Sequence, residues 1–186
     1  MRFILPAAIL WALWSGAAAA DDTWTKFDSD SDGFSVDFPG VPSILEPLPL
    51  VVSNVTIKTR TYGFVADKQS YLVSVSDLSN RLLVSNPKVF LDSLVKEQSA
   101  GGEIENNSPM EIDGNPGREV MFTTGDGELV RAREIYVSGT IVQVVFRDAA
   151  KDHRAAKPDA ARFMKSFRFG TAAGKDSKQT ARSTPE

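Results

Sequence analysis

Four short β segments that follow one another along the chain constrain its fold most. They are expected over residues 109–112, 118–124, 128–137 and 140–147. The residues between them are typical of tight turns: Gly114-Asn115-Pro116-Gly117, Gly125-Asp126-Gly127 and Ser138-Gly139. Because no helix separates the segments, neighbouring strands must pair antiparallel. This part of the sequence therefore predicts a β-meander.

More strands are predicted ahead of the meander. Apolar and polar residues alternate over 34–38, which predicts a half-buried strand. Residues 55–65 alternate in the same way, and after a turn the alternation returns over 71–75, so a hairpin is expected there. The prolines within residues 41–50 predict an extended loop or an edge strand.

Two amphipathic helices are predicted, one on each side of the meander in the sequence. The first covers residues 87–99 and follows the capping residue Asn86, and its apolar face carries Phe90, Leu91, Leu94 and Val95. The second covers residues 158–167, and its apolar face carries Ala160, Phe163, Met164 and Phe167. We therefore expect an α+β fold, with one antiparallel β-sheet covered by two amphipathic helices in an α/β/α sandwich.

The first twenty residues have the order of a secretory signal. A positive charge at Arg2 precedes an apolar run, and four alanines then precede Asp21. The apolar run is about a dozen residues long, shorter than the roughly 20 that a membrane-spanning helix needs. We expect cleavage after Ala20, a single domain over residues 21–169, a disordered tail over 170–186, and a periplasmic or secreted protein with no membrane span.

The composition excludes several classes of function. The chain has no cysteine, so it forms no disulfide, thiolate metal site or thiol nucleophile. Its net charge is −3, and removal of Arg2 with the signal changes it to −4. An acidic chain of this kind is a poor match for nucleic acid, which requires clustered Lys and Arg. We expect a monomer without a cofactor.

Four segments share a pattern with a known group of exported proteins. They are Gly33-Phe34-Ser35-Val36-Asp37-Phe38-Pro39-Gly40, Tyr71-Leu72-Val73-Ser74-Val75-Ser76-Asp77, Gly114-Asn115-Pro116-Gly117-Arg118-Glu119 and Ala161-Arg162-Phe163-Met164-Lys165-Ser166-Phe167. Together they resemble exported bacterial proteins with the fold of PsbP, an extrinsic protein of photosystem II. The same fold occurs in a nuclear-transport factor that binds the GTPase Ran. The resemblance spans residues 24–169 and implies a PsbP-like domain with an accessory or partner-binding role in the cell envelope.

The segment from Asp28 to Gly33 contains the sharpest local motif. Asp28, Asp30 and Asp32 alternate ahead of a glycine, as the first ligands of a calcium loop do. Such a loop closes with a glutamate at its twelfth position, but that position is Pro39 here. We favour a polar hairpin turn, and a calcium site at these three aspartates remains the alternative.

A set of arginines on the meander is the candidate ligand or partner face. Arg131 and Arg133 share one face of a predicted strand, and strand pairing can bring Arg118 and Arg147 beside them. Such a cluster recognises carboxylates and other anions. The favoured alternative is a solvated sheet face on which acidic residues, among them Glu134, pair with the arginines.

We expect a non-enzymatic accessory domain that binds another envelope protein or a small ligand. The only histidine, His153, lies between charged residues in a polar connector, where a solvated side chain is the favoured interpretation over a catalytic one. No nucleophile motif is present to support a hydrolase. A periplasmic hydrolase and a calcium-dependent binding module that uses Asp28, Asp30 and Asp32 are the alternatives.

Overall fold

A computed structural model describes residues 24–46, 50–52, 55–66, 68–79, 84–149 and 158–170. The predicted signal segment, His153 and nearly all of the predicted tail lie outside these residues. None of the helices within the described part of the chain is long and apolar enough to span a membrane.

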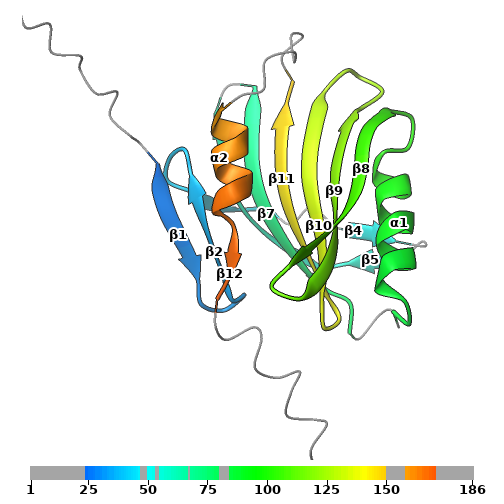
Figure 1. The fold of residues 1–186 in the computed structure, drawn as a ribbon. Coiled ribbons are helices and arrows are strands. Elements are labelled where there is room, and N and C mark those ends of the chain that lie inside the picture. The colour runs from blue at the N-terminus through cyan, green and yellow to red at the C-terminus, as the bar shows by residue number, and fades with distance from the viewer. Residues whose placement is uncertain are drawn as a thin grey trace, which may run out of the picture.

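A seven-stranded antiparallel sheet forms the centre of the molecule (Figure 1). Its strands, in spatial order, are β3 (Ser43–Leu45), β6 (Thr59–Ala66), β7 (Gln69–Asp77), β11 (Thr140–Asp148), β10 (Leu129–Val137), β9 (Asn115–Thr123) and β8 (Glu103–Ile112). The last four strands form the predicted meander. Strand β8 is longer than the predicted segment 109–112. Its initial residues are mostly polar and are exposed at the edge of the sheet, so they show no apolar alternation.

Two-residue turns connect β8 to β9 and β10 to β11. Asp113 and Gly114 both have positive φ, as do Ser138 and Gly139, which is the backbone that the twist of a tight hairpin requires. The first turn was predicted at Gly114-Asn115-Pro116-Gly117, but Asn115 and Pro116 already belong to β9. The turn is formed by Asp113 and Gly114 and does not include Pro116. The prediction placed the turn too late because it treated Pro116 as a turn residue.

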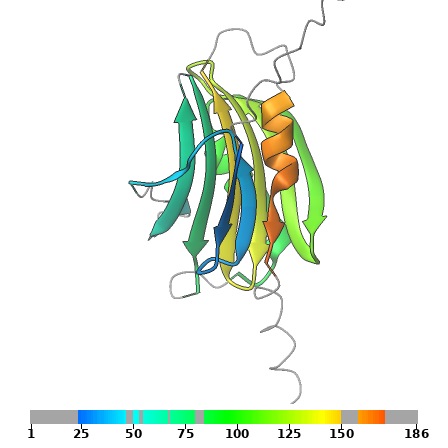
Figure 2. The ribbon, with the colours of Figure 1, turned by 90° about the vertical axis from the view of Figure 1, so that its left-hand side faces the viewer.

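One face of the sheet is covered by helix α2 (Pro158–Ser166) and a small three-stranded sheet. The small sheet consists of β1 (Thr25–Ser29), β2 (Phe34–Phe38) and β12 (Arg168–Phe169), and β1 and β2 lie in front of the main sheet in Figure 2. Aromatic rings fill the space between these layers, and the fully buried ones are Phe38, Tyr71, Phe146, Phe163 and Phe167. This cluster is the larger part of the core.

The opposite face carries helix α1 (Pro87–Gln98) and a two-stranded sheet of β4 (Leu50–Val52) and β5 (Val55–Ile57). The side chain of Asn86 accepts hydrogen bonds from the backbone N–H groups of Lys88 and Val89, and Pro87 occupies the first turn. Leu91 and Leu94 are buried against Ile141 of β11, whereas Phe90 is only partly buried.

The predicted α+β fold with an antiparallel sheet and two helices is confirmed. The expected α/β/α sandwich describes the layers incompletely, because each helix shares its face of the main sheet with a smaller sheet. Residues 55–65 were predicted as one strand, but the chain is interrupted at Lys58. The residues before it pair with β4, and those after it pair with β3 and β7, so the two parts belong to different sheets.

Candidate functional site

The four candidate arginines do not form one face. Arg131 pairs with Phe146 and Arg133 with Val144 in the register of β10 and β11, which places both arginines on the α2 face of the sheet. Arg118 is opposite Glu134 of β10, and Arg147 is opposite Val130 of β10. Glu134 and Val130 are each one residue away from Arg133 or Arg131 along β10, so they and their partners lie on the other face of the sheet. The prediction of one arginine cluster is therefore wrong: the strand registers put two arginines on each face.

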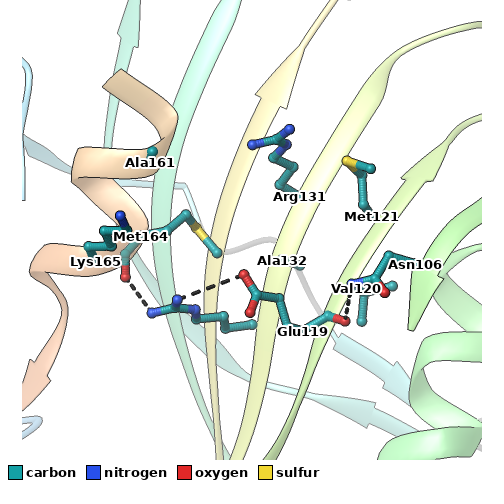
Figure 3. Close-up of a pocket in the computed structure, with 10 residues that line it drawn as sticks. Asn106, Glu119, Val120, Met121, Arg131, Ala132, Ala161, Met164 and Lys165 are labelled. Carbon is teal, nitrogen blue, oxygen red and sulfur yellow. Dashed lines mark hydrogen bonds and ion pairs between the residues drawn. The ribbon is translucent and has the colours of Figure 1, made fainter. Parts of the chain in front are cut away.

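Arg131 and Arg133 lie in a groove between α2 and strands β8 to β10 (Figure 3). The groove exists because the meander extends beyond α2 in the direction of β8 (Figure 1). Its volume is about 270 Å³. We call it the Arg131 groove, and its lining residues are Asn106, Glu119, Val120, Met121, Arg131, Ala132, Arg133, Ala161, Met164 and Lys165.

Arg133 fixes the position of α2 over the sheet. Its Nη1 donates a hydrogen bond to the carbonyl oxygen of Met164 at 2.6 Å, and its Nη2 is 3.7 Å from Oε1 of Glu119. A carbonyl in the last turn of a helix lacks a partner within the helix, so the guanidinium satisfies it. Arg133 thus has a structural contact that leaves little of its charge for a ligand.

Arg131 and Lys165 are the cations that the Arg131 groove leaves available. Within the described part of the chain, no carboxylate pairs with Arg131, and its side chain stands between α2 and Met121 without a drawn contact (Figure 3). Lys165 is exposed on the last turn of α2. The lining therefore has three cations against the single carboxylate of Glu119, although the whole chain is acidic.

The chemistry of the Arg131 groove suits an anion that is attached to an apolar group. A guanidinium offers several N–H donors in a planar fork that matches a carboxylate, and it remains charged at any physiological pH. Met121 and Met164 form a flexible apolar lining next to it. These groups can bind and orient a ligand. An arginine stays protonated in a protein, so it cannot accept a proton as a general base.

Arg118 and Arg147 make ion pairs on the opposite face. Arg118 pairs with Asp92 and so connects β9 to α1, while Arg147 pairs with Glu128. Arg147 also lies at a second groove, between α1 and β4, with a volume of about 410 Å³. We call this the Gln143 groove; its lining residues are Leu50, Val51, Thr59, Leu72, Ser74, Glu97, Gln98, Phe122, Thr124, Val130, Gln143, Val145 and Arg147.

Glu134 is a buried carboxyl that the sequence interpretation placed wrongly. It was expected to be a solvated partner of the arginines, but its residue is 1% exposed on the α1 face. Its Oε2 accepts a hydrogen bond from Nε2 of Gln143 at 2.9 Å, and its Oε1 has no partner among the described residues. Burial raises the pKa of Glu134 to about 7, and the hydrogen bond from Gln143 offsets only part of that effect. The sequence did contain a signal for this burial: Glu134 is two residues from Ala132 and four from Val130, so all three side chains lie on the same buried face of β10.

Asp28 and Asp32 have separate partners at the β1–β2 hairpin, which also carries Asp30. Asp28 pairs with Lys26 at 2.8 Å, whereas the side chain of Asp32 is 1% exposed and accepts a hydrogen bond from the Tyr62 hydroxyl at 2.6 Å. Arg60 pairs with the same carboxylate. Desolvation of Asp32 would raise its pKa, but hydrogen bonds from Arg60 and Tyr62 outweigh it and lower the pKa.

The calcium alternative at Asp28, Asp30 and Asp32 finds no ligand cluster in this part of the fold. Among the described residues, no group of three or more Asp, Glu or His side chains is arranged to hold a metal ion. Asp32 is directed to a guanidinium and a phenol, which are not metal ligands of a calcium loop. Strand β2 begins directly after Gly33, where an EF-hand would continue its loop.

Comparisons with known proteins identify the fold. No family model and no curated protein sequence matches this chain. The chain is similar to the solution structure of cyanobacterial PsbP (CyanoP) from Synechocystis sp. PCC 6803, with a TM-score of 0.51 and 16% sequence identity. The match covers 84% of this chain and 98% of that one. The chain therefore has a PsbP-like fold, as its sequence predicted, and a likeness at this identity concerns the fold alone.

Proposed function

We propose that this protein is an exported, non-enzymatic accessory domain that binds an acidic segment of another envelope protein in the Arg131 groove. The observation that carries the proposal is the guanidinium of Arg131, which makes no ion pair within the described structure and shares the groove lining with Lys165 and two methionines. The cations of the groove attract an acidic partner, and the net negative charge of the chain confines such a partner to the groove.

The shape of the Arg131 groove supports a polypeptide ligand over a free inorganic anion. The groove extends from α2 across β10 and β9 to Asn106 of β8, so its cations occupy only one side of an elongated surface. The remainder contains Met121, Met164 and Asn106, together with Glu119, whose carboxylate lies 3.7 Å from Arg133. A peptide with a carboxylate and a neighbouring apolar side chain uses both parts, whereas a small anion uses only the cations.

Binding rather than catalysis is supported by the roles that the charged groups already have. Arg133 holds the carbonyl of Met164, and Glu119 lies within ion-pair distance of Arg133. Neither group is positioned as an acid or base for a bound substrate, which general acid–base catalysis requires. The PsbP-like fold agrees with an accessory role only by analogy, because one fold hosts many functions.

Export is the part of the proposal that rests on the sequence alone. Residues 1–20 have the three regions of a secretory signal, and small residues precede Asp21. N-terminal sequencing of the protein purified from its native host should give Asp21 as the first residue in the periplasmic or secreted fraction. A protein that begins at Met1 in the cytoplasmic fraction would contradict export.

Photo-crosslinking in the native host tests the proposed binding site. A photoreactive amino acid replaces Met121 in the Arg131 groove, and a matched variant carries it at Val51, which is 53% exposed on the other side of the sheet. We expect one discrete crosslinked partner from position 121, with an acidic peptide at the junction, and loss of this product when Arg131→Glu is added. The same product from both positions, or its persistence with Arg131→Glu, would refute the proposed site.

A further inference from the structure

The Gln143 groove is mostly apolar, with a polar centre on the main sheet. Its apolar lining consists of Leu72, Phe122, Val130 and Val145 from the main sheet, together with Leu50 of β4. This polar centre carries the side chains of Ser74 and Gln143. Small-molecule sites have this composition: a mostly apolar cleft of roughly 300–1,000 Å³ with a few placed polar groups. The volume of about 410 Å³ lies within that range.

The polar centre is part of a row of side chains that crosses four strands in register. Thr61 is opposite Ser74, Ser74 is opposite Gln143, and Gln143 is opposite Glu134. The hydroxyls of Thr61 and Ser74 are 3.0 Å apart, and Gln143 donates to Glu134. The row therefore consists of two hydrogen-bonded pairs, and its two inner members, Ser74 and Gln143, both line the Gln143 groove.

This row has unused hydrogen-bonding capacity at Gln143, one of its two inner members, and at Glu134, which ends the row outside the groove. Within the described structure, the amide oxygen of Gln143 accepts no hydrogen bond from a side chain, and the second oxygen of Glu134 is buried without a partner. A polar group in an apolar environment destabilises the fold unless something bonds to it. A buried polar row of this kind beneath an open groove is therefore more consistent with a ligand site than with a packed core.

The charged residues at the rim of the Gln143 groove already interact within the protein. Arg147 pairs with Glu128, and Glu97 on α1 also has an interaction within the protein. The polar centre has no cation, and Glu134 is screened from the groove by Gln143, to which it is hydrogen-bonded. A charged ligand would lose its hydration and gain no free counter-ion at the polar centre.

We propose that the Gln143 groove is a binding site for a small, uncharged and largely apolar molecule whose single hydrogen-bonding group meets Ser74 and Gln143. The site is independent of the Arg131 groove, because the main sheet separates the two. Its ligand packs against Leu72, Phe122 and Val145, and its polar group bonds to the amide of Gln143. The protein then has one face for a polypeptide and another for a small molecule.

Two fluorescent probes with one skeleton test this site. N-phenyl-1-naphthylamine is uncharged and has one N–H group, and 1-anilinonaphthalene-8-sulfonate is the same skeleton with a negative charge. Both probes are titrated into the mature chain with Arg131→Glu and Lys165→Glu, because the wild-type Arg131 groove suits an anion attached to an apolar group. We expect saturable binding of one uncharged probe per chain of this double variant, and at least tenfold weaker binding of the sulfonate, for which an apolar site without a free cation is unfavourable. Equal or tighter binding of the sulfonate would refute an uncharged ligand.

Substitutions and chemical shifts locate the probe. Val145→Phe should fill the groove and abolish binding, while the matched Met121→Phe, in the Arg131 groove, should leave binding unchanged. Ser74→Ala removes only a hydroxyl and should weaken binding about fivefold, the effect of one hydrogen bond. It provides the test should Val145→Phe not fold. Amide shifts of the wild-type chain should change around Ser74 and Gln143; shifts confined to the Arg131 groove, or unchanged affinity in folded Ser74→Ala, would overturn the proposal.

Discussion

Replacing Glu134 by glutamine should remove a pH-dependent loss of stability from this protein. The carboxyl is 1% exposed, one of its oxygens accepts a hydrogen bond from Gln143, and the other has no partner among the described residues. Glutamine has nearly the same shape, and its amide oxygen accepts the same hydrogen bond from Gln143. Glu134→Gln therefore changes the ionisation of the site and little else.

The magnitude follows from the pKa of Glu134, which burial raises from 4.5 to about 7. Below pH 4.5 the carboxyl is protonated in both the folded and the unfolded chain, and the folded state has no penalty. Between pH 4.5 and 7 the unfolded chain ionises first, so the free energy of unfolding falls as pH rises. Above pH 7 the loss is complete and amounts to about 3 kcal/mol.

Urea unfolding at pH 4, 5, 6, 7 and 8 measures this difference. The free energy of unfolding of Glu134→Gln minus that of the wild type should be about 3 kcal/mol larger at pH 8 than at pH 4. Leu94→Ala is the control: Leu94 is buried on the same face and does not titrate, so its loss of about 2–5 kcal/mol should be the same at every pH. A difference between Glu134→Gln and the wild type that stays constant over this range would refute the reasoning.

Three other substitutions have defined outcomes. Asp32→Asn removes the charge that pairs with Arg60 and should lower the free energy of unfolding at pH 7 by about 1–3 kcal/mol in urea titrations. Because the pKa of Asp32 is lowered in the folded state, this loss should shrink as the pH falls below about 4. Gly139→Ala forces a side chain into a φ of 87° and should lower the melting temperature, at a cost of about 1–2 kcal/mol. Arg131→Ala should change the free energy of unfolding by less than about 0.5 kcal/mol, since no ion pair among the described residues is lost.

Alternation and capping predicted most of the secondary structure because those signals are local. Residues 34–38 form a strand as expected, and α1 begins at Pro87 after Asn86, because burial on one face and a free backbone N–H impose those residue types directly. The predicted ends of both helices are one residue too long, at positions 99 and 167. Helix ends depend on the last hydrogen bonds, which the sequence does not specify to one residue.

The candidate site depended on relations between strands, which the sequence specifies poorly. Arg131 and Arg133 share a face because they are two residues apart on one strand. The positions of Arg118 and Arg147 required the registers of three strands, and a shift of one residue reverses the face. The burial of Glu134 was missed because a charged residue at a core position contradicts the usual pattern, so it was interpreted as exposed.

Selection of peptides by charge tests the central claim, the binding of an acidic segment in the Arg131 groove, most directly. A display library of random peptides is selected in parallel against the mature chain and against the double variant Arg131→Glu, Lys165→Glu, after both are shown to fold. The account predicts that the wild type enriches peptides in which Asp or Glu lies near an apolar residue, and that the double variant enriches basic peptides instead. Enrichment of the same peptides by both proteins, or no acidic preference of the wild type, would contradict it.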